Sequence, residues 1–172
     1  MERLWTPWRM SYIESATGSG TAGVGDGACF LCEKSRAPQA QDQENLIVYR
    51  AERGFIVLNL YPYNSGHVMV APYEHIGDLA ALPAAVGHAL FDLTRQAVAA
   101  LQREYRPDGF NVGMNLGRTA GAGLPDHLHI HVVPRWNGDT NFMPVIGGTK
   151  VLPEALDRTW ERLRRHFKSP DA

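Results

Sequence analysis

The sequence predicts an α+β fold: an antiparallel sheet with helices on one side. Runs of β-prone residues follow one another along the chain, and one long helical pattern is inserted between them. Strict alternation of strands and helices would instead indicate a parallel sheet. Of the 172 residues, 44% are hydrophobic and 20% are charged, so we expect a single domain over 1–172 with a sizeable core.

The charge balance gives the chain no general attraction to nucleic acid. Seventeen basic and eighteen acidic residues leave a net charge of −1, so any phosphate binding has to come from a local site. No apolar run approaches the roughly 18 residues that span a bilayer, and the segment Met1–Trp8 lacks the apolar core of a signal peptide. We therefore expect a cytoplasmic protein without a membrane partner.

Three β-prone runs come before the long helix. The runs 46–49 and 55–58 are separated by a short polar turn, which predicts a hairpin. Strong turn chemistry over 60–66 leads into a third strand over 67–71. Further upstream, the segment 15–28 is rich in Gly, Ser, Thr and Ala, and it buries too little apolar surface to order itself. We predict a mobile loop there.

A long helix and a second set of patterns follow. Pro83 suits the first residue of a helix, and apolar residues then recur at three- and four-residue spacing as far as Leu101, which predicts one buried stripe. The remaining patterns predict a strand over 110–115, a glycine-bearing loop over 117–126, a strand over 127–133 ended by Pro134, and a second helix over 152–167 opened by Pro153.

The strand over 127–133 carries the strongest chemical signal. Successive side chains of a strand point to opposite faces, so His127, His129 and His131 are predicted to share one face and the intervening aliphatic residues the other. The aliphatic face would anchor the strand and fix its register. A neutral imidazole can attack phosphorus, while a protonated neighbour can donate to phosphate oxygens. One row of histidines could therefore serve both purposes.

The glycine-bearing loop precedes these histidines directly. Glycines remove steric obstruction, so the backbone N–H groups of residues 117–123 could approach an anion. A glycine-rich loop alone is weak evidence for such a site, because many are simple connectors. Its position immediately before three histidines favours a phosphate-binding interpretation.

Together these residues resemble a known family. The segment 127–133 resembles the histidine triad (HIT) signature, in which three histidines alternate with hydrophobic residues, and the segment 59–70 resembles the upstream strand-turn-strand element of that family. The motifs at 4–10, 59–64 and 134–142 are similar to those of the bacterial HIT branch that phosphorolyses diadenosine tetraphosphate. The resemblance covers nearly the whole chain.

The resemblance implies roles for several of the histidines. His129 would be the nucleophile that forms a covalent nucleotidyl-histidine intermediate, which is then released to water or inorganic phosphate. His131 would contact the phosphate, and His67 would support the triad. The related uridylyltransferase branch has Gln where this chain has His131, so a hexose-phosphate substrate is disfavoured.

The resemblance also implies substrate contacts. Asn59 would contact ribose, and Asn115 would contact phosphate or the intermediate. Many HIT members have Gln and Ser at the positions of Gly123 and Leu124, so backbone amides from Gly121 to Gly123 would have to replace those side chains. This departure weakens an assignment as an ordinary phosphoramidate hydrolase.

Two cysteines form a candidate metal site. Cys29 and Cys32 have a two-residue gap, which in a reducing compartment indicates a metal or redox site more than a structural disulfide. A structural zinc needs four ligands. The resemblance implies that His75 and His127 complete the set, and zinc would then pin the N-terminal segment to the histidine strand.

Several functions remain open from the sequence. The leading one is a nucleotidyl transferase or hydrolase that cleaves dinucleoside polyphosphates through His129. A nucleoside phosphoramidate hydrolase is the alternative of the same class. The alternatives of other classes are a zinc hydrolase with the three histidines as ligands, and a nucleotide-binding protein without catalysis. The resemblance further implies a homodimer formed through the long helix and the neighbouring sheet.

Overall fold

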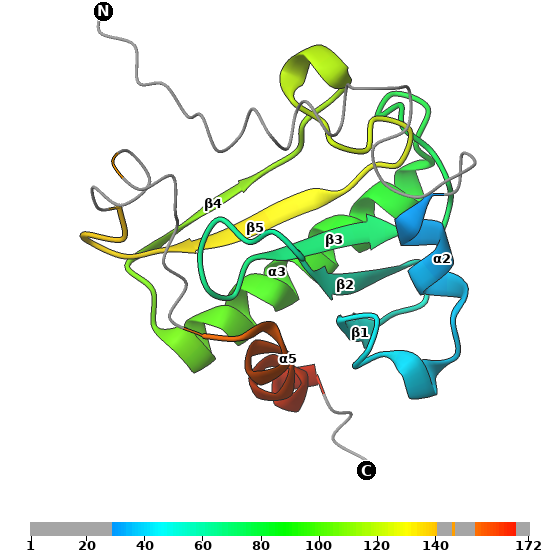
Figure 1. Ribbon diagram of the computed structural model, residues 1–172. Helices are drawn as coiled ribbons and strands as arrows, with labels where there is room; N and C mark the ends of the chain where they lie inside the picture. Colours follow the sequence, from blue (N-terminus) through cyan, green and yellow to red (C-terminus); the bar gives the residue numbers. More distant parts are fainter. Residues whose placement is uncertain (1–28, 141–145, 147–153, 168–172) are drawn as a thin grey trace, which may run out of the picture.

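The computed structural model describes residues 29–140, 146 and 154–167, and it contains one antiparallel sheet of five strands in the order β1-β2-β3-β5-β4 (Figure 1). The strands are β1 (Ile47–Arg50), β2 (Gly54–Leu58), β3 (Val68–Pro72), β4 (Gly109–Gly113) and β5 (Ile130–Arg135). The predicted α+β class and the hairpin of the first two strands are confirmed. The segment predicted as a mobile loop, 15–28, lies outside the described residues.

Within the described ranges, three helices accompany the sheet: α2 (Phe30–Arg36), α3 (Ala84–Tyr105) and α5 (Leu156–Arg164). Short 3₁₀ turns occupy Gln39–Gln41, Arg118–Ala120 and Arg165–Phe167. In the part of the chain that the structure describes, no helix combines the length and the apolar character needed to cross a bilayer.

Helix α3 covers one face of the sheet and packs across β2, β3 and β5 (Figure 1). Every residue of β2 and β3 is buried, which explains why these strands read as continuous apolar runs. The predicted stripe of α3 is buried against them and includes Val86, Leu90, Leu93, Ala97 and Leu101. The core therefore lies between α3 and the central strands, and it fixes the position of β5.

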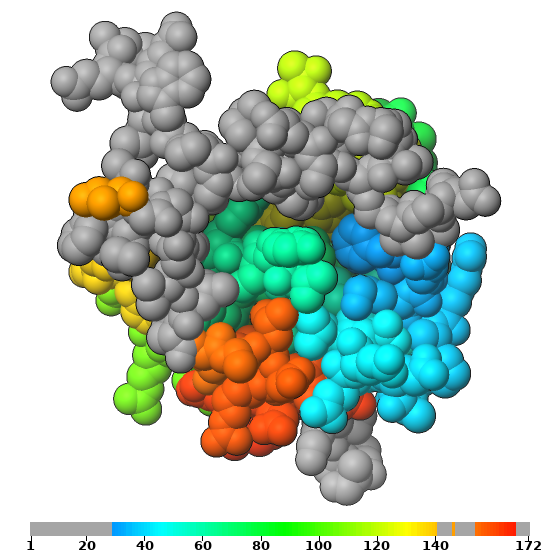
Figure 2. Space-filling view, viewed as in Figure 1, coloured from blue at the N-terminus to red at the C-terminus, as the bar shows by residue number. Residues whose placement is uncertain are grey.

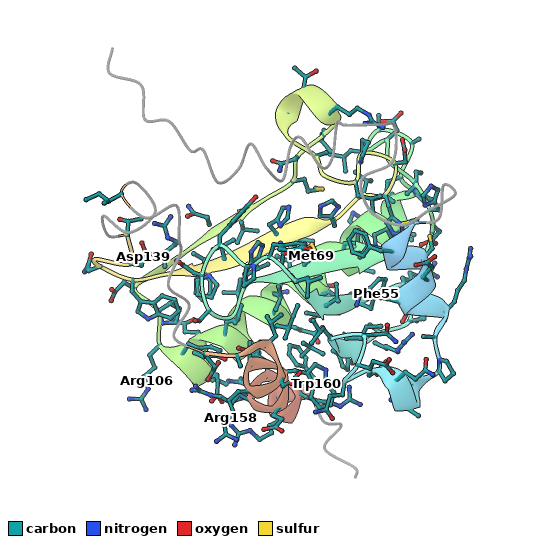
Figure 3. The ribbon with its side chains drawn as sticks, viewed as in Figure 1. Phe55, Met69, Arg106, Asp139, Arg158 and Trp160 are labelled. Carbon is teal, nitrogen blue, oxygen red and sulfur yellow. The ribbon has the colours of Figure 1, made fainter. Side chains whose placement is uncertain are left out.

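Helix α5 packs against β1, which is an edge strand of the sheet, and against the C-terminal end of α3. The Trp160 Nε1–H donates to the carbonyl of Ile47 at 2.8 Å, which joins the helix to the backbone of β1 (Figure 3). Figure 2 shows α5, in orange, next to the cyan segment that includes β1. The C-terminal helix was thus predicted correctly, although Pro153, its predicted first residue, lies outside the described residues.

An ion network joins α5 to the C-terminal end of α3. Arg162 Nε lies 2.6 Å from Glu104 Oε1, and its Nη1 lies 2.6 Å from Glu154 Oε1. The same guanidinium stacks over the ring of Tyr105 at 4.5 Å from the centroid. Two partly buried carboxylates therefore share one cation, and Glu104 also contacts His166 Nε2 at 2.7 Å.

We expect Arg162→Ala to lower the free energy of unfolding by about 1–2 kcal/mol, because it removes one ion pair from each of those two carboxylates. Chemical denaturation measures the change. Arg158→Ala is the matched control, since Arg158 pairs with Glu161 on the exposed surface of the same helix (Figure 3), and its loss should cost less than about 0.5 kcal/mol. Equal losses in the two variants would contradict this assignment.

The same network predicts a dependence on pH. The hydrogen bond with His166, together with Arg162, holds the pKa of Glu104 below its ordinary value of 4.5. A carboxylate whose folded pKa is depressed stabilises the fold above its unfolded pKa, and this contribution is lost as the pH falls through the folded value. The difference in unfolding free energy between wild type and Arg162→Ala should therefore shrink below about pH 4.5.

The structure corrects several sequence-based boundaries. Helix α2 was not predicted, and Pro83 lies just before α3, which begins at Ala84. Strand β5 begins at Ile130 and not at residue 127, because β3 pairs with it only from Val68 to Val70. It also continues through Pro134, which is tolerated because only β4 pairs with β5 at that point.

Candidate active site

His131 lies on β5, in the interior of the sheet. Its neighbours across the ladder are Met69 on β3 and Gly113 on β4 (Figure 3 labels Met69). Cross-strand partners present their side chains on the same face of a sheet. A Cβ placed on Gly113 would meet nothing within 4 Å, so the β4 side of His131 is open space among the described residues.

His129 lies just before β5 and is held by the backbone. Its Nδ1 lies 2.9 Å from the carbonyl oxygen of His127, and a carbonyl can only accept, so Nδ1 carries the hydrogen. In the neutral ring Nε2 then has the lone pair. Burial lowers the pKa of His129, although the bond to the His127 carbonyl opposes that shift. The ring thus presents an unprotonated nitrogen beside His131, whose ring centroid is 4.9 Å away.

A chain of hydrogen bonds orients His131. The backbone N–H of Tyr63 donates to His67 Nδ1 at 3.1 Å, so in the neutral His67 ring the hydrogen is on Nε2. His67 Nε2 lies 3.0 Å from His131 Nδ1, to which it can donate. His131 then carries its own hydrogen on Nε2. One backbone amide therefore gives His131 a donor next to the lone pair of His129.

His127 belongs to a different cluster. Its Nδ1 lies 3.2 Å from Cys29 Sγ and 3.5 Å from Cys32 Sγ, and Cys32 Sγ lies 3.4 Å from His75 Nδ1. The ligand atoms of these four residues all lie within 4.8 Å of one another. On the far side of the ring, His127 Nε2 donates to the carbonyl of Pro72 at 3.0 Å, which leaves Nδ1 with its lone pair toward the thiols.

Helix α2 explains how the two cysteines converge. Cys29 is the residue that caps the helix, and Cys32 follows one turn later, so both lie on the same side. The segment preceding Leu128 is tied to the loop that carries His75, because the Leu128 N–H donates to the Ile76 carbonyl at 2.7 Å. The thiols and the two imidazoles are therefore joined from three separate segments of the chain.

The three histidines of the signature fall into two clusters, with His127 beside the thiols and His129 beside His131. The side chain of His127 is fully buried and turned toward the thiols, and His129 is only 7% exposed. The predicted start of the strand at residue 127 was wrong, because β5 begins only at Ile130. His129 and His131 remain adjacent, as predicted.

The predicted substrate contacts fall in two places. Asn59 lies beside His67: its Nδ2 is 3.5 Å from His67 Nε2, and its Oδ1 accepts the Tyr61 N–H at 2.9 Å. Asn115 lies in the glycine-bearing loop, where its Nδ2 donates to the carbonyl of Gly121 at 3.3 Å. This bond braces the loop in a turn that requires positive φ at Gly121.

Gly121 and Gly123 are both exposed, so their backbone can be reached from solvent. The chain leaves the sheet at Gly113, the partner of His131, and returns to it at Ile130, where β5 begins. The loop therefore starts and ends next to His131.

Comparison with known proteins identifies the family. The HIT domain model matches residues 40–138. The chain belongs to the HIT family. It is 44% identical over 159 residues to the AP-4-A phosphorylase of Mycobacterium tuberculosis, a match that covers 92% of this chain and 80% of that protein. The NitFhit fusion protein of Caenorhabditis elegans is 32% identical over 73% of this chain and 25% of its own length.

A solved HIT structure supports the fold assignment. The zinc-bound histidine triad family protein from Mycobacterium smegmatis superposes with a TM-score of 0.64 at 25% identity, over 83% of this chain and 94% of that one. The histidine triad nucleotide-binding protein from Sulfolobus tokodaii gives a TM-score of 0.62 at 22% identity. The predicted HIT-like architecture is confirmed.

Sequence reasoning missed the groups that orient the HIT histidines. The Tyr63 amide orients the ring of His67. The His127 carbonyl orients His129, and the Pro72 carbonyl orients His127. All three are backbone groups, which have no side-chain signature. The carbonyl that orients His129 belongs to the residue two positions earlier, but any residue type there would supply one, so the histidine pattern carries no signal for it.

Proposed function

We propose that this HIT protein cleaves dinucleoside polyphosphates, diadenosine tetraphosphate above all, by phosphorolysis through a nucleotidyl intermediate on His129. The observation that carries the proposal is the arrangement of hydrogens at the histidine pair: His129 presents the lone pair of Nε2, and His131 presents an N–H beside it. A nucleophile next to a donor suits attack on a charged phosphoryl group. The 44% identity to the mycobacterial AP-4-A phosphorylase supports the choice of substrate.

The reaction would proceed in two displacements. His129 Nε2 attacks the α-phosphorus, so that the N–P bond forms while the bond to the bridging oxygen breaks and ATP leaves. An oxygen of inorganic phosphate then attacks the same phosphorus, which breaks the N–P bond, releases ADP and restores His129. The His131 N–H would donate to a phosphoryl oxygen in both steps, where negative charge accumulates. Asn59 would bind ribose, and the amides of Gly121 and Gly123 would bind phosphate.

Product analysis tests the proposal. We expect the protein to convert diadenosine tetraphosphate to ATP and ADP, and to do so only when inorganic phosphate is present. Labelled inorganic phosphate should appear as the terminal phosphate of ADP. If AMP and ATP form at an equal rate in water alone, the acceptor is water and the phosphorolysis part of the proposal fails. Faster turnover of a nucleoside phosphoramidate would favour the alternative of the same class.

The cysteine cluster is proposed to hold a structural zinc. For Zn–S of about 2.3 Å and Zn–N of about 2.0–2.1 Å, a tetrahedral ion separates sulfur from nitrogen by roughly 3.5 Å. The three S···N distances of 3.2, 3.4 and 3.5 Å fit that spacing. The Pro72 carbonyl bound to the far nitrogen of His127 is the partner that metal-ligating histidines usually have. When bound, zinc would cross-link α2 to the sheet.

The position of His127 disfavours the three-histidine zinc hydrolase. Among the described residues, the group of side chains close enough to share a metal ion contains His127 but neither His129 nor His131. We propose a cytoplasmic location for the protein, because free thiols that bind zinc stay reduced in that compartment.

We also propose that the protein is a homodimer. Strand β4 lies at the edge of the sheet, and no described strand pairs with its outer side. Val112 on β4 is 50% exposed and Phe91 on α3 is 65% exposed. An open edge with apolar side chains suits pairing with a second copy. Light scattering should give twice the chain mass for wild type and one chain mass for Val112→Asp, and a wild-type monomer would refute the proposal.

A further inference from the structure

We propose that Asn64 and Asp139 are positioning residues that set the hydrogen arrangement of the His67–His131 pair. The inference deepens the proposed function and rests on the role given there to His131. Neither residue contacts either ring through its own side chain among the described contacts, so both would act through the backbone of the turn that carries Tyr63 and His67.

Asp139 lies beyond the end of β5 and accepts several hydrogen bonds there (Figure 3). Arg135 donates to both carboxylate oxygens, at 2.5 and 2.9 Å, and the Trp136 amide donates at 3.2 Å. The hydrogen bonds from Arg135 are the main cause that holds the pKa of Asp139 well below its usual range. The fourth donor is the side chain of Asn64, whose Nδ2 lies 2.7 Å from Asp139 Oδ2. The carboxylate is thus a rigid, charged acceptor for Asn64.

Asn64 connects the Asp139 carboxylate to the turn that carries Tyr63 and His67. Its Nδ2 also donates to the carbonyl of Pro134 at 3.0 Å, and the residue is only 8% exposed. Its backbone carbonyl accepts the His67 N–H at 3.1 Å, which closes the turn across Gly66. Gly66 has a φ of +78°, a conformation that side-chain-bearing residues rarely adopt. The turn therefore has a fixed shape, tied at one point to the end of β5.

Tyr63, next to Asn64, supplies the amide that decides the tautomer of His67. With that N–H on His67 Nδ1, the hydrogen of His67 points to His131 Nδ1, and the hydrogen of His131 is on Nε2. If the turn loses its side-chain anchor, the Tyr63 amide can move away from Nδ1. His67 could then carry its hydrogen on Nδ1, and His131 Nδ1 would lose its donor. The N–H that the proposed reaction uses would no longer be enforced.

The test uses Asn64→Ala in the full-length protein. We expect kcat for diadenosine tetraphosphate to fall on the order of 10- to 100-fold with KM changed by less than about threefold, because a misplaced donor weakens the transition state more than ground-state binding. Histidine ¹⁵N NMR reads the tautomers directly: wild type should show one tautomer at His67, and the variant a mixture. Asp139→Asn should give the same changes at smaller size, since one amide oxygen cannot accept all four donors.

Two controls separate positioning from simple loss of stability. Arg164→Ala should lower the midpoint of thermal unfolding while leaving kcat and the His67 tautomer as in wild type, because Arg164 contacts Asp42, the Val48 carbonyl and the Trp160 ring and makes no described contact with the turn. The double variant Asn64→Ala/Asp139→Asn should lose no more kcat than Asn64→Ala, since Asp139 is proposed to act through Asn64.

The outcomes are distinct. An unchanged His67 tautomer in both Asn64→Ala and Asp139→Asn would overturn the inference, and so would a fully multiplicative loss in the double variant. Where Asn64→Ala does not fold, Asp139→Asn provides the same spectrum from a side chain of nearly equal shape. A mixed tautomer with wild-type kcat would support the positioning role and contradict the role proposed for the His131 N–H.

Discussion

His129→Ala is expected to lower kcat on diadenosine tetraphosphate by on the order of 10⁴-fold or more, the size of loss seen when a covalent nucleophile is removed. Nε2 of His129 is the one nitrogen of the histidine pair that the described hydrogen bonds leave with a lone pair next to an N–H donor. Alanine supplies no atom to form the N–P bond. Initial rates with saturating phosphate measure the effect.

A trapped intermediate would give direct proof of the nucleophile. Wild type quenched during turnover without added phosphate should carry one nucleotidyl group on His129, detected by mass spectrometry of the peptide. His129→Ala should carry none. His88→Ala is the matched control, because His88 is an exposed histidine on α3 outside the site, and it should keep wild-type kcat and the adduct. An adduct on any other residue, or full activity in His129→Ala, would refute the mechanism.

Loss of Cys32, a proposed zinc ligand, has the second-largest expected effect. Cys32 Sγ lies near both His75 and His127, so Cys32→Ser removes the ligand that links the two imidazoles. An ion present at a thousand times its dissociation constant stabilises the fold by about 4 kcal/mol, and the variant should lose most of this. We expect wild type to hold one zinc per chain by atomic emission and Cys32→Ser to hold less than a tenth.

The midpoint of thermal unfolding tests whether the proposed zinc stabilises the fold. A strong chelator should lower the midpoint for wild type to that of Cys32→Ser, and it should barely change the variant. Arg162→Ala serves as the control, since it should unfold earlier than wild type but keep its metal. A wild-type protein that binds no zinc, or a midpoint unmoved by the chelator, would remove the structural role. Activity is also expected to fall, because the carbonyl of the proposed ligand His127 orients His129.

The coupling of the two sites through His127 is a consequence of the fold. One residue supplies its side chain to the thiol cluster and its carbonyl to the nucleophile. Burial raises the pKa of the Cys29 thiol and lowers the pKa of His127, so without a cation this cluster favours neutral groups. A divalent ion would stabilise the thiolates and hold the His127 backbone in place.

Local patterns in the sequence determined much of this protein. The alternation around His129 and His131, the periodicity of α3 and the spacing of the two cysteines each depend on residues within a few positions of one another, so each can be read without the fold. These patterns predicted the sheet, the long helix and the two adjacent histidines, all of which the structure contains. Through family resemblance they also led to the four residues of the cysteine cluster.

Only the tertiary structure decided which nitrogen of each imidazole carries the hydrogen. Cys29 and His127 are 98 residues apart, and the amide that orients His67 sits in a turn anchored by Asn64 to Asp139, 75 residues away. Periodicity predicted a strand from residue 127, whereas β5 begins at Ile130 and the His127 ring lies against the thiols. The physical reason is that hydrogen-bond direction depends on backbone groups brought together by packing, and such groups are the same in every residue but proline.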